Sequence, residues 1–382
     1  MLWGRAAGRC QKCNLVLSWD PHTKADANLA EAAHIIGFSN DGPRPERDIP
    51  EHMINDISNL MLLCRLCHTP IVDVKEKEFT VERLRQMKRA HEDRVERVTA
   101  IGQERGSHIL LYGASVGEHN PQVSYQVAAP ALVPDDRYPA SRTPLSLSMN
   151  SSFRDRTEEF WKIEAQHLST MVAQQVIPRL RQGDIEHLSV FAVAPQPLLV
   201  LLGHLICDIN YAARVYQLHR EPPGWAWQDH PNGFAYSVER PNGARGQPAL
   251  ILALSAHVAD ERIFAKIGAD AAIWRVTILQ PNNDYLKSAA QLQMFRELIR
   301  PLLDEIKDRY PPGTILNAFP AAPVSICVEL GRAIQPKAHM PLRLWDQNND
   351  LGGFVKALDI NMQYGDCKDP AGHFVPCNPR EE

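Results

Sequence analysis

The sequence predicts two parts of different fold class. A small α+β domain over residues 1–101, held together by a metal ion, precedes a larger α/β domain over residues 108–382, and residues 102–107 form the linker. Two observations support this. Two Cys-x-x-Cys pairs frame the first part, and in the second part apolar strands alternate with helices, the pattern of a largely parallel sheet. Two rounds of this alternation, split near residue 240, predict two Rossmann-like halves.

Composition restricts the class of protein. Hydrophobic residues make up 44% of the chain and charged residues 23%, as in a soluble globular protein rather than a disordered one. No apolar run is long enough to span a bilayer, and the N-terminus lacks the apolar segment of a signal peptide. We therefore expect a cytoplasmic protein with no membrane partner.

The net charge does not indicate a nucleic-acid-binding protein. It is -4 for the whole chain, and residues 1–100 carry 15 Lys and Arg against 15 Asp and Glu. Binding to a nucleic acid would have to depend on a local basic patch, on metal ions, or on several copies acting together.

The elements of the first part follow from short patterns. We expect a short helix or turn before the first cysteine pair, a hairpin at 15–18, a strand at 30–36, a loop at 37–50 that is rich in Gly, Pro, Asn and Asp, and a helix at 80–101. Thr80 is the expected helix cap, and apolar residues recur on one helix face. The other face is basic, which fits a solvated surface or a contact with the DNA backbone.

The elements of the second part come from apolar runs between polar breaks. Strands are expected at 109–112, 187–193, 215–218, 249–255, 273–279, 314–319, 342–345 and 354–358, and helices at 155–181, 286–309 and 323–332. A Pro- and Ser-rich excursion at 128–150 separates the first strand from the first helix.

Four cysteines have the spacing of a structural zinc site. Cys10, Cys13, Cys64 and Cys67 form two Cys-x-x-Cys pairs, here called knuckles, and four thiolates give the tetrahedral environment that suits zinc. Because protein ligands fill all four positions, the ion would be structural, closing a loop of about 50 residues in a domain with a small core.

The region around the knuckles resembles the HNH endonuclease family, whose ββα-metal fold holds one catalytic divalent ion between a hairpin and a helix. The matching residues are Ala33-His34-Ile35, Asn59 to Cys64, and Cys67-His68, within residues 5 to 75. The resemblance implies that His34 is the general base for water and that His68 binds Mg²⁺ or another divalent cation. Asn59 would brace the loop or orient His34, and the substrate would be double-stranded DNA.

One position departs from the family pattern. Many members have an acidic residue or histidine directly before the first motif histidine, where this chain has Ala33. Because side chains alternate along a strand, Glu31 points to the same side as Ala33. We expect Glu31, or Asp73 after the second knuckle, to supply the missing carboxylate.

Candidate ligand-binding residues of the second part gather at predicted strand ends. In doubly wound sheets, ligands bind beyond the carboxyl ends of the strands, where aromatic rings stack on bases and arginines pair with phosphates. The candidates are Ser115, Trp225, Trp227, Ser255, His257, Pro320 and Arg332.

The order of the parts resembles the HNH–SAVED effectors of bacterial anti-phage signalling (CBASS). The matching stretches are Tyr216 to Arg220 with the two tryptophans, Ser255 to His257, and Ala318 through Arg332. The resemblance implies a SAVED domain with two CARF-like halves that binds a cyclic di- or trinucleotide, which drives homo-oligomerisation and DNA degradation. A nuclease domain with a net charge of zero fits such a switch, since assembly raises the affinity for DNA through effective concentration.

Two other functions fit the same residues. One is a non-catalytic zinc-knuckle DNA-binding regulator with a metabolite-sensing domain. The other is a constitutive restriction-type HNH nuclease whose second part reads DNA. Replacement of His34 separates the first from an enzyme, and cleavage with and without cyclic nucleotides separates the second from a gated one.

Overall fold

The structure is a computed structural model that describes residues 1–38, 42–45, 50–117, 121, 123–149, 157–207, 212–243, 245–335, 339–348, 352–360, 367–368 and 374–375. The chain divides into two compact units, Met1–Glu104 and Arg105–Glu382, and this division falls inside the expected linker. Parts of three predicted segments lie outside the described residues: residues 39–41 and 46–49 of the loop, residue 150 of the Pro- and Ser-rich excursion, and residues 155–156 of the helix.

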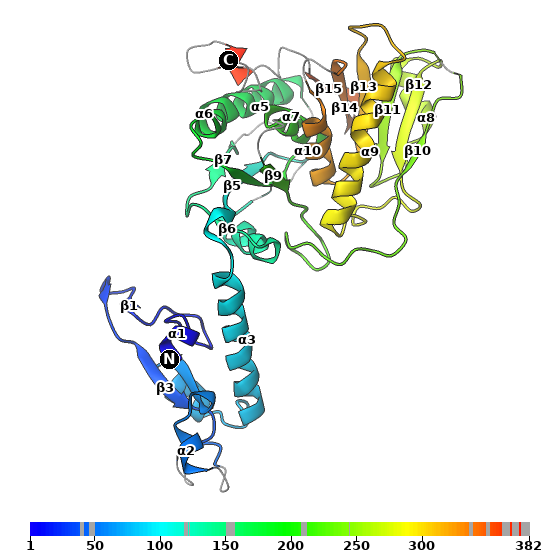
Figure 1. Ribbon diagram of the computed structural model, residues 1–382. Coiled ribbons are helices and arrows are strands. Elements are labelled where there is room, and N and C mark those ends of the chain that lie inside the picture. The colour runs from blue at the N-terminus through cyan, green and yellow to red at the C-terminus, as the bar shows by residue number, and fades with distance from the viewer. Residues whose placement is uncertain are drawn as a thin grey trace. The chain divides into compact units, whose positions relative to one another are not determined.

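The first unit is built on one antiparallel hairpin, β3 with β4 (Figure 1). Its elements are α1 (Leu2–Arg5), β1 (Trp19–Asp20), β2 (Ala25–Asp26), β3 (Ala30–His34), α2 (Glu51–Ile54), the 3₁₀ turn η1 (Ile57–Asn59), β4 (Leu60–Cys64), the π turn η2 (His68–Asp73) and α3 (Val81–Thr99). The register pairs His34 with Leu60 and Ala30 with Cys64, so the first motif histidine and the second knuckle lie at opposite ends of the hairpin.

The first knuckle is fixed to β4 through one residue. Gln11 donates its backbone N–H to Leu62 O (2.9 Å), and its side-chain oxygen accepts from Leu62 N (2.8 Å). At the expected hairpin of residues 15–18, the chain turns back along the first knuckle, and Cys10 N donates to Leu15 O (2.9 Å). The strands that pair with each other, β1 and β2, come later in the chain. These bonds hold Cys10 and Cys13 against the strand that carries Cys64.

Helix α3 has the predicted N-cap, but its apolar face is buried over a shorter length than predicted. The Thr80 hydroxyl accepts from Arg83 N (3.3 Å), as expected for an N-cap. Leu84 and His91 are buried, and His91 Nε2 lies 3.0 Å from Ala6 O, but Val98 is 41% exposed. Packing against the first unit therefore covers only the first half of this helix.

The second unit begins with a parallel sheet in the order β6-β5-β8-β9, with β7 paired to β5. Its strands are β5 (Gly106–Gly113), β6 (Tyr138–Pro139), β7 (Leu145–Ser146), β8 (His187–Val193) and β9 (Ala212–Val215), and its helices are α4 (Tyr125–Ala128), η4 (Ala129–Asp135), α5 (Glu158–Met171), the π turn η5 (Val172–Val176), α6 (Ile177–Arg181) and α7 (Gln196–Leu205). The strand expected at 215–218 was wrong in position, since β9 ends at Val215. The single helix expected through Arg181 is divided by the π turn, because Pro178 has no N–H for the preceding turn.

The other sheet of the second unit has the order β10-β12-β11-β13-β14-β15. Its elements are β10 (Ser237–Glu239), β11 (Pro248–Ala253), α8 (Asp260–Ile267), β12 (Ala272–Thr277), α9 (Ala289–Lys307), β13 (Leu316–Ala321), α10 (Val324–Ala333), β14 (Leu342–Asn348) and β15 (Gly353–Ile360). The four central strands are parallel, while β10 and β15 pair antiparallel at the two edges. The connection from β14 to β15 is too short for a parallel crossover. A further pair, β16 (Cys367–Lys368) with β17 (Phe374–Val375), is antiparallel.

Alternation along β11 places helices on both faces of this sheet. Leu250 and Leu252 belong to the large apolar cluster that includes α9, whereas Ala249, Ile251 and Ala253 belong to the cluster that includes α8. This layering is that of an open α/β sheet.

Helices α7 and α10 join the two sheets through a pair of glycines. A Cβ at Gly203 would overlap Val328 O, and a Cβ at Gly331 would overlap Val200 O and lie 2.8 Å from His204 N. Only glycine allows two helix backbones to approach so closely, which explains its presence inside two helices where it otherwise disfavours helix. The two sheets therefore share one continuous apolar core.

Candidate functional site

The four predicted zinc ligands lie together. The sulfurs of Cys10, Cys13, Cys64 and Cys67 all lie within 4.8 Å of one another, and Cys13 Sγ is 3.7 Å from Cys64 Sγ. A tetrahedral zinc ion with Zn–S bonds of about 2.3 Å requires sulfurs about 3.8 Å apart. The donor set and its spacing therefore fit zinc.

Two thiols of the cluster, Cys13 and Cys67, resist ionisation in the absence of a cation. Burial raises the pKa of the Cys67 thiol, and hydrogen bonds with the Cys64 and Cys13 sulfurs raise it further. Burial also raises the pKa of the Cys13 thiol, whereas backbone hydrogen bonds outweigh burial at Cys10 and lower its pKa. A bound cation favours the thiolate form of its ligands. A metal ion would thus stabilise the contact between the knuckle at 10–13 and the knuckle at 64–67.

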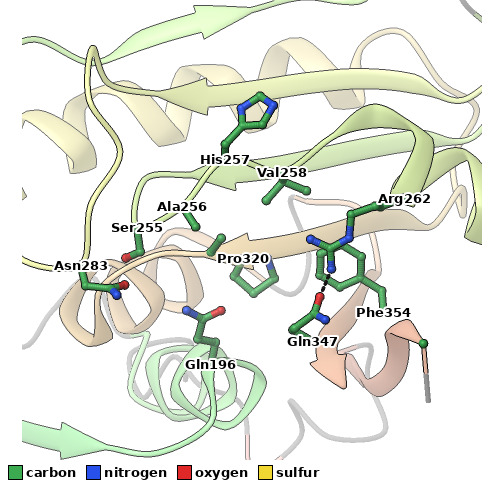
Figure 2. A pocket seen from close by; sticks show the side chains of 13 residues that line it. Gln196, Ser255, Ala256, His257, Val258, Arg262, Asn283, Pro320, Gln347 and Phe354 are labelled. Atoms are coloured by element: carbon green, nitrogen blue, oxygen red, sulfur yellow. Dashed lines mark hydrogen bonds between the residues drawn. The ribbon is translucent and has the colours of Figure 1, made fainter. Parts of the chain in front are cut away.

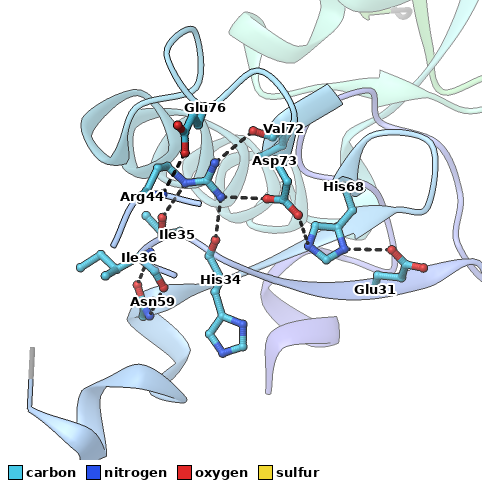
Figure 3. A network of polar contacts seen from close by, with 10 residues as sticks. All are labelled: Glu31, His34, Ile35, Ile36, Arg44, Asn59, His68, Val72, Asp73 and Glu76. Atoms are coloured by element: carbon cyan, nitrogen blue, oxygen red, sulfur yellow. Dashed lines mark hydrogen bonds and ion pairs between the residues drawn. The ribbon is translucent and has the colours of Figure 1, made fainter. Parts of the chain in front are cut away.

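His68 lies between two carboxylates. Its Nδ1 is 2.9 Å from Glu31 Oε2 and its Nε2 is 3.2 Å from Asp73 Oδ2 (Figure 3). The imidazole and Asp73 come from the two ends of η2, and Glu31 comes from β3. Both carboxylates named in the sequence analysis therefore contact the predicted metal-binding histidine.

Arg44 connects this cluster to the strand that carries His34. Its side chain is 5% exposed and forms an ion pair with Asp73 Oδ1 at 2.9 Å. It also donates to three backbone carbonyls, those of Ile35 (2.9 Å), Val72 (3.0 Å) and His34 (3.3 Å). One guanidinium thus fixes the end of β3 and the end of η2 in a single geometry.

Sequence reasoning missed Arg44. The residue lies in the Gly-Pro-rich loop, where a single arginine carries no pattern, and its backbone has φ 54°, in the left-handed region. Such a conformation costs a non-glycine residue of order 1–3 kcal/mol unless surrounding contacts enforce it. The four acceptors of its side chain are those contacts.

The side chains of His34 and Asn59 contact different groups. Asn59 is buried, accepts from Ile36 N (2.9 Å), and donates to Ile54 O (2.9 Å) and Ile36 O (3.2 Å), which are the bonds of a loop brace. The His34 ring lies 3.0 Å from Asn55 Oδ1 and points away from His68 in Figure 3. The two motif histidines are linked through the backbone of His34 and Arg44, not by contact of their rings.

The residues present fit a divalent cation beside His68. An imidazole with carboxylate oxygens is a common donor set for Mg²⁺ and for transition metals, and a ligating histidine usually has a carboxylate on its other ring nitrogen. Glu31 is 36% exposed, whereas Asp73 is held by Arg44. Glu31 is therefore the carboxylate better placed to share an ion with His68, and Asp73 the one better placed to orient the ring.

The second unit has a cavity of about 670 Å³ at the carboxyl ends of β11 and β13, here called the strand-end cavity (Figure 2). Three predicted ligand residues line it: Ser255, His257 and Pro320. Gln196, the first residue of α7, the helix that follows β8 of the other sheet, also lines it and donates to Ala322 O (2.8 Å). The cavity therefore lies mainly on the second sheet, with one residue from α7, and its size is in the ligand range of about 300–1,000 Å³.

Arg262 supplies a positive charge to the strand-end cavity. Its guanidinium lies 4.5 Å from the centre of the Phe354 ring and contacts the Gln347 side chain. Sequence reasoning missed Arg262 because α8, which carries it, was not predicted. A short amphipathic segment after the strand at 248–253 was the available signal.

The other four predicted ligand residues lie elsewhere. Trp225 is 4% exposed and packs edge-on against Phe191 at 5.2 Å, whereas Trp227 lines a different cavity. Arg332 pairs with Glu329 (2.9 Å) and donates to Ala213 O (3.3 Å), and Ser115 is half-buried after β5. The structure does not bring the seven candidates into one site.

None of the helices in the described part of the chain is both long and apolar enough to cross a bilayer.

Comparisons with known proteins agree with this organisation. Residues 10–70 match the family model described as HNH endonuclease, and residues 168–360 match the one described as SMODS-associated and fused to various effectors sensor domain, SAVED. No curated protein matches.

Solved structures of SAVED/CARF-domain receptors named Cap4 are similar to the chain. The receptor from Acinetobacter baumannii with the cyclic trinucleotide 2'3'3'-cAAA has 11% identity and a TM-score of 0.43, over 74% of this chain and 61% of that chain. The receptor from Moraxella osloensis has 12% identity and a TM-score of 0.40, over 74% and 61%. The chain thus spans less than two thirds of the length of these receptors.

The SAVED match alone covers 193 of the 382 residues. The resemblance inferred from the sequence is confirmed, and this chain belongs to the SAVED family, with an HNH endonuclease domain at its N-terminus.

Proposed function

We propose that this protein is a cyclic-oligonucleotide-activated, metal-dependent DNA endonuclease of bacterial anti-phage (CBASS) defence, acting in the cytoplasm. The observation that carries the proposal is the placement of His68 between Glu31 and Asp73 in an HNH domain that is joined to a SAVED sensor. This donor set is one that hydrolytic metal sites use.

The proposed roles follow from the contacts. Glu31 and His68 hold the catalytic cation, which when bound supplies Lewis-acid stabilisation of the scissile phosphate. Asp73 orients the His68 ring and is itself fixed by Arg44 (2.9 Å). Asn59 braces the loop after β3, and Cys10, Cys13, Cys64 and Cys67 hold a structural zinc ion.

His34 is the proposed general base. Asn55 presents its carbonyl oxygen to His34 Nε2 at 3.0 Å, so Nε2 carries the ring proton and Nδ1 keeps its lone pair. A neutral imidazole can take a proton from water near pH 7. Arg44 holds the backbone of this residue, which keeps the base at a constant distance from the His68 cluster.

The sensor function is proposed for the second unit. Its two sheets would be the two CARF-like halves, and the strand-end cavity, which Gln196 of α7 reaches from the first half, would bind a cyclic di- or trinucleotide. Ser255, His257 and Pro320 line that cavity, whereas Trp225, Trp227 and Arg332 are less favourably placed. Ligand binding would favour a homo-oligomer, in which several nuclease units, each with a net charge near zero, bind double-stranded DNA together.

Plasmid cleavage with Mg²⁺ and a panel of cyclic di- and trinucleotides tests the proposal. We expect cleavage only with an activating nucleotide, and loss of cleavage by at least about 100-fold in His34→Ala and His68→Ala. His22→Ala, an exposed histidine of the same unit, is the matched control.

Each alternative has its own outcome. Cleavage that is unchanged in His34→Ala would exclude this residue as the base. DNA binding without cleavage under every condition would favour the non-catalytic regulator, and cleavage without any nucleotide would favour the constitutive nuclease.

A further inference from the structure

The second unit has another cavity, of about 450 Å³, here called the arginine cavity. It lies between β9, the edge strand of the first sheet, and the first turns of α9. Arg105 and Arg137 directly precede β5 and β6, and His187 begins β8, so this cavity is at the amino ends of the strands. It shares no lining residue with the strand-end cavity.

Four arginines line the arginine cavity: Arg105, Arg137, Arg214 and Arg296, all half-buried. Two carboxylates contact them, because Asp135 pairs with Arg214 (2.7 Å) and Glu329 pairs with Arg296 (2.6 Å). Arg105 donates to two backbone carbonyls, those of Asp136 (3.0 Å) and Asp135 (3.3 Å). Glu329 also pairs with Arg332 (2.9 Å), so among the described residues the positive charges exceed the two carboxylates by at least two.

The crowding of positive charges lowers the pKa values of two residues that line the cavity, Arg137 and His187. Burial lowers the pKa of Arg137, and the charges of Arg105 and Arg214 lower it further. Burial, followed by the charge of Arg137 and then of other arginines, lowers the pKa of His187 to about 3. His187 is therefore neutral at pH 7, and an anion in the cavity would relieve the repulsion among the guanidinium groups.

The other walls also favour a phosphorylated ligand. Ala289 and Ala290 lie in the first turn of the 19-residue helix α9, where N–H groups and the helix dipole attract anions. Trp227 adds a half-buried aromatic wall. Guanidinium forks match phosphate oxygens, and a phosphomonoester carries about two negative charges at pH 7, which the excess of positive charge in the cavity can balance.

We propose that the arginine cavity binds the phosphate or diphosphate group of a small molecule of mononucleotide size. This second site is separate from the proposed activator site and does not depend on the proposed function. A carboxylate from a second copy of the chain is less favoured, since it brings one negative charge to a cavity with an excess of at least two positive charges.

Titration calorimetry on the full chain, at constant ionic strength, tests this with sodium pyrophosphate and with AMP. We expect both to bind, and Arg137→Gln to raise both dissociation constants about tenfold or more, as expected for loss of a charge-assisted hydrogen bond. Ala290→Glu places a carboxylate at an exposed position that tolerates it, because acids stabilise a first helical turn, and should also abolish binding. Tighter binding of AMP than of pyrophosphate would identify a nucleotide as the ligand class, and the reverse would identify a diphosphate alone.

Two controls locate the effect. Arg181→Gln removes an exposed arginine outside the cavity, and Asn283→Trp fills the mouth of the strand-end cavity, so both should leave the pyrophosphate dissociation constant within twofold. The proposal is overturned if pyrophosphate and AMP do not bind, or if they bind Arg137→Gln and Ala290→Glu as they bind the unaltered protein. It is also overturned if Asn283→Trp alone removes binding, or if Arg137→Gln changes only self-association in sedimentation.

Discussion

Replacement of Arg44 by methionine removes a side chain that connects the backbone of His34 to the His68 cluster. The guanidinium is 5% exposed, pairs with Asp73 at 2.9 Å and donates to three carbonyls. Breaking a mostly buried ion pair by removing one partner costs about 3–5 kcal/mol. Because methionine fills most of the same volume, the loss is in polar contacts, and we expect the first unit to lose stability of that order.

The functional consequence of this replacement is a weaker cation site. Without Arg44, Asp73 is free to turn away from His68, and loss of such a supporting partner lowers metal affinity about 10–100-fold. We therefore expect activated cleavage by Arg44→Met to need about 10–100-fold more Mg²⁺ for half-maximal rate. Arg44→Lys restores the charge but not the fork, so its Mg²⁺ requirement should lie between the two.

The assay is the initial rate of activated plasmid cleavage against Mg²⁺ concentration, with thermal unfolding measured in parallel. Arg85→Met, an exposed arginine of α3, is the matched control and should behave as the unaltered protein. If Arg44→Met keeps both its melting temperature and its Mg²⁺ requirement, the assignment of Arg44 as a positioning residue is wrong.

Three further predictions concern stability and metal content. Burial raises the pKa of Glu164 to about 7, above its unfolded value, so the wild-type protein loses stability as pH rises from about 4.5 to 7. Between pH 5 and pH 8, the free energy of unfolding of Glu164→Gln should therefore gain about 3 kcal/mol relative to wild type in denaturant unfolding. Parallel pH profiles of the two proteins would contradict this. Gly331→Ala should lower stability by about 1–3 kcal/mol in calorimetry because its Cβ overlaps Val200 O, whereas Gly4→Ala has open space and should not. Cys67→Ser should reduce bound zinc, measured by elemental analysis, below one per chain and unfold the first unit, and equal zinc in both proteins would count against the four-sulfur site.

The predictions that agree with the structure came from short sequence patterns. The spacing of Cys10, Cys13, Cys64 and Cys67 implied a cluster, and the sulfurs do lie within 4.8 Å. Thr80 caps α3 as expected because capping depends only on residues three apart. Strand alternation placed Glu31 on the side of Ala33, and in the structure its carboxylate contacts His68 at 2.9 Å.

Long-range arrangements could not be predicted. Trp225 and Arg332 follow strands as ligand residues often do, but strand order places them away from the cavity that Ser255 and His257 line. The arginine cavity combines residues from 105 to 296, which no local pattern links. The edge strands β10 and β15 are antiparallel because of the chain's connections, and their residues give no sign of direction.

The most direct test of the account is plasmid cleavage by the full chain with Mg²⁺, measured for each of a panel of cyclic di- and trinucleotides and without any. We predict that at least one nucleotide raises the cleavage rate by a hundredfold or more, that Asn283→Trp in the strand-end cavity weakens this activation, and that His68→Ala abolishes cleavage. Cleavage at the same rate with and without every nucleotide, or activated cleavage that survives in His68→Ala, would contradict the account.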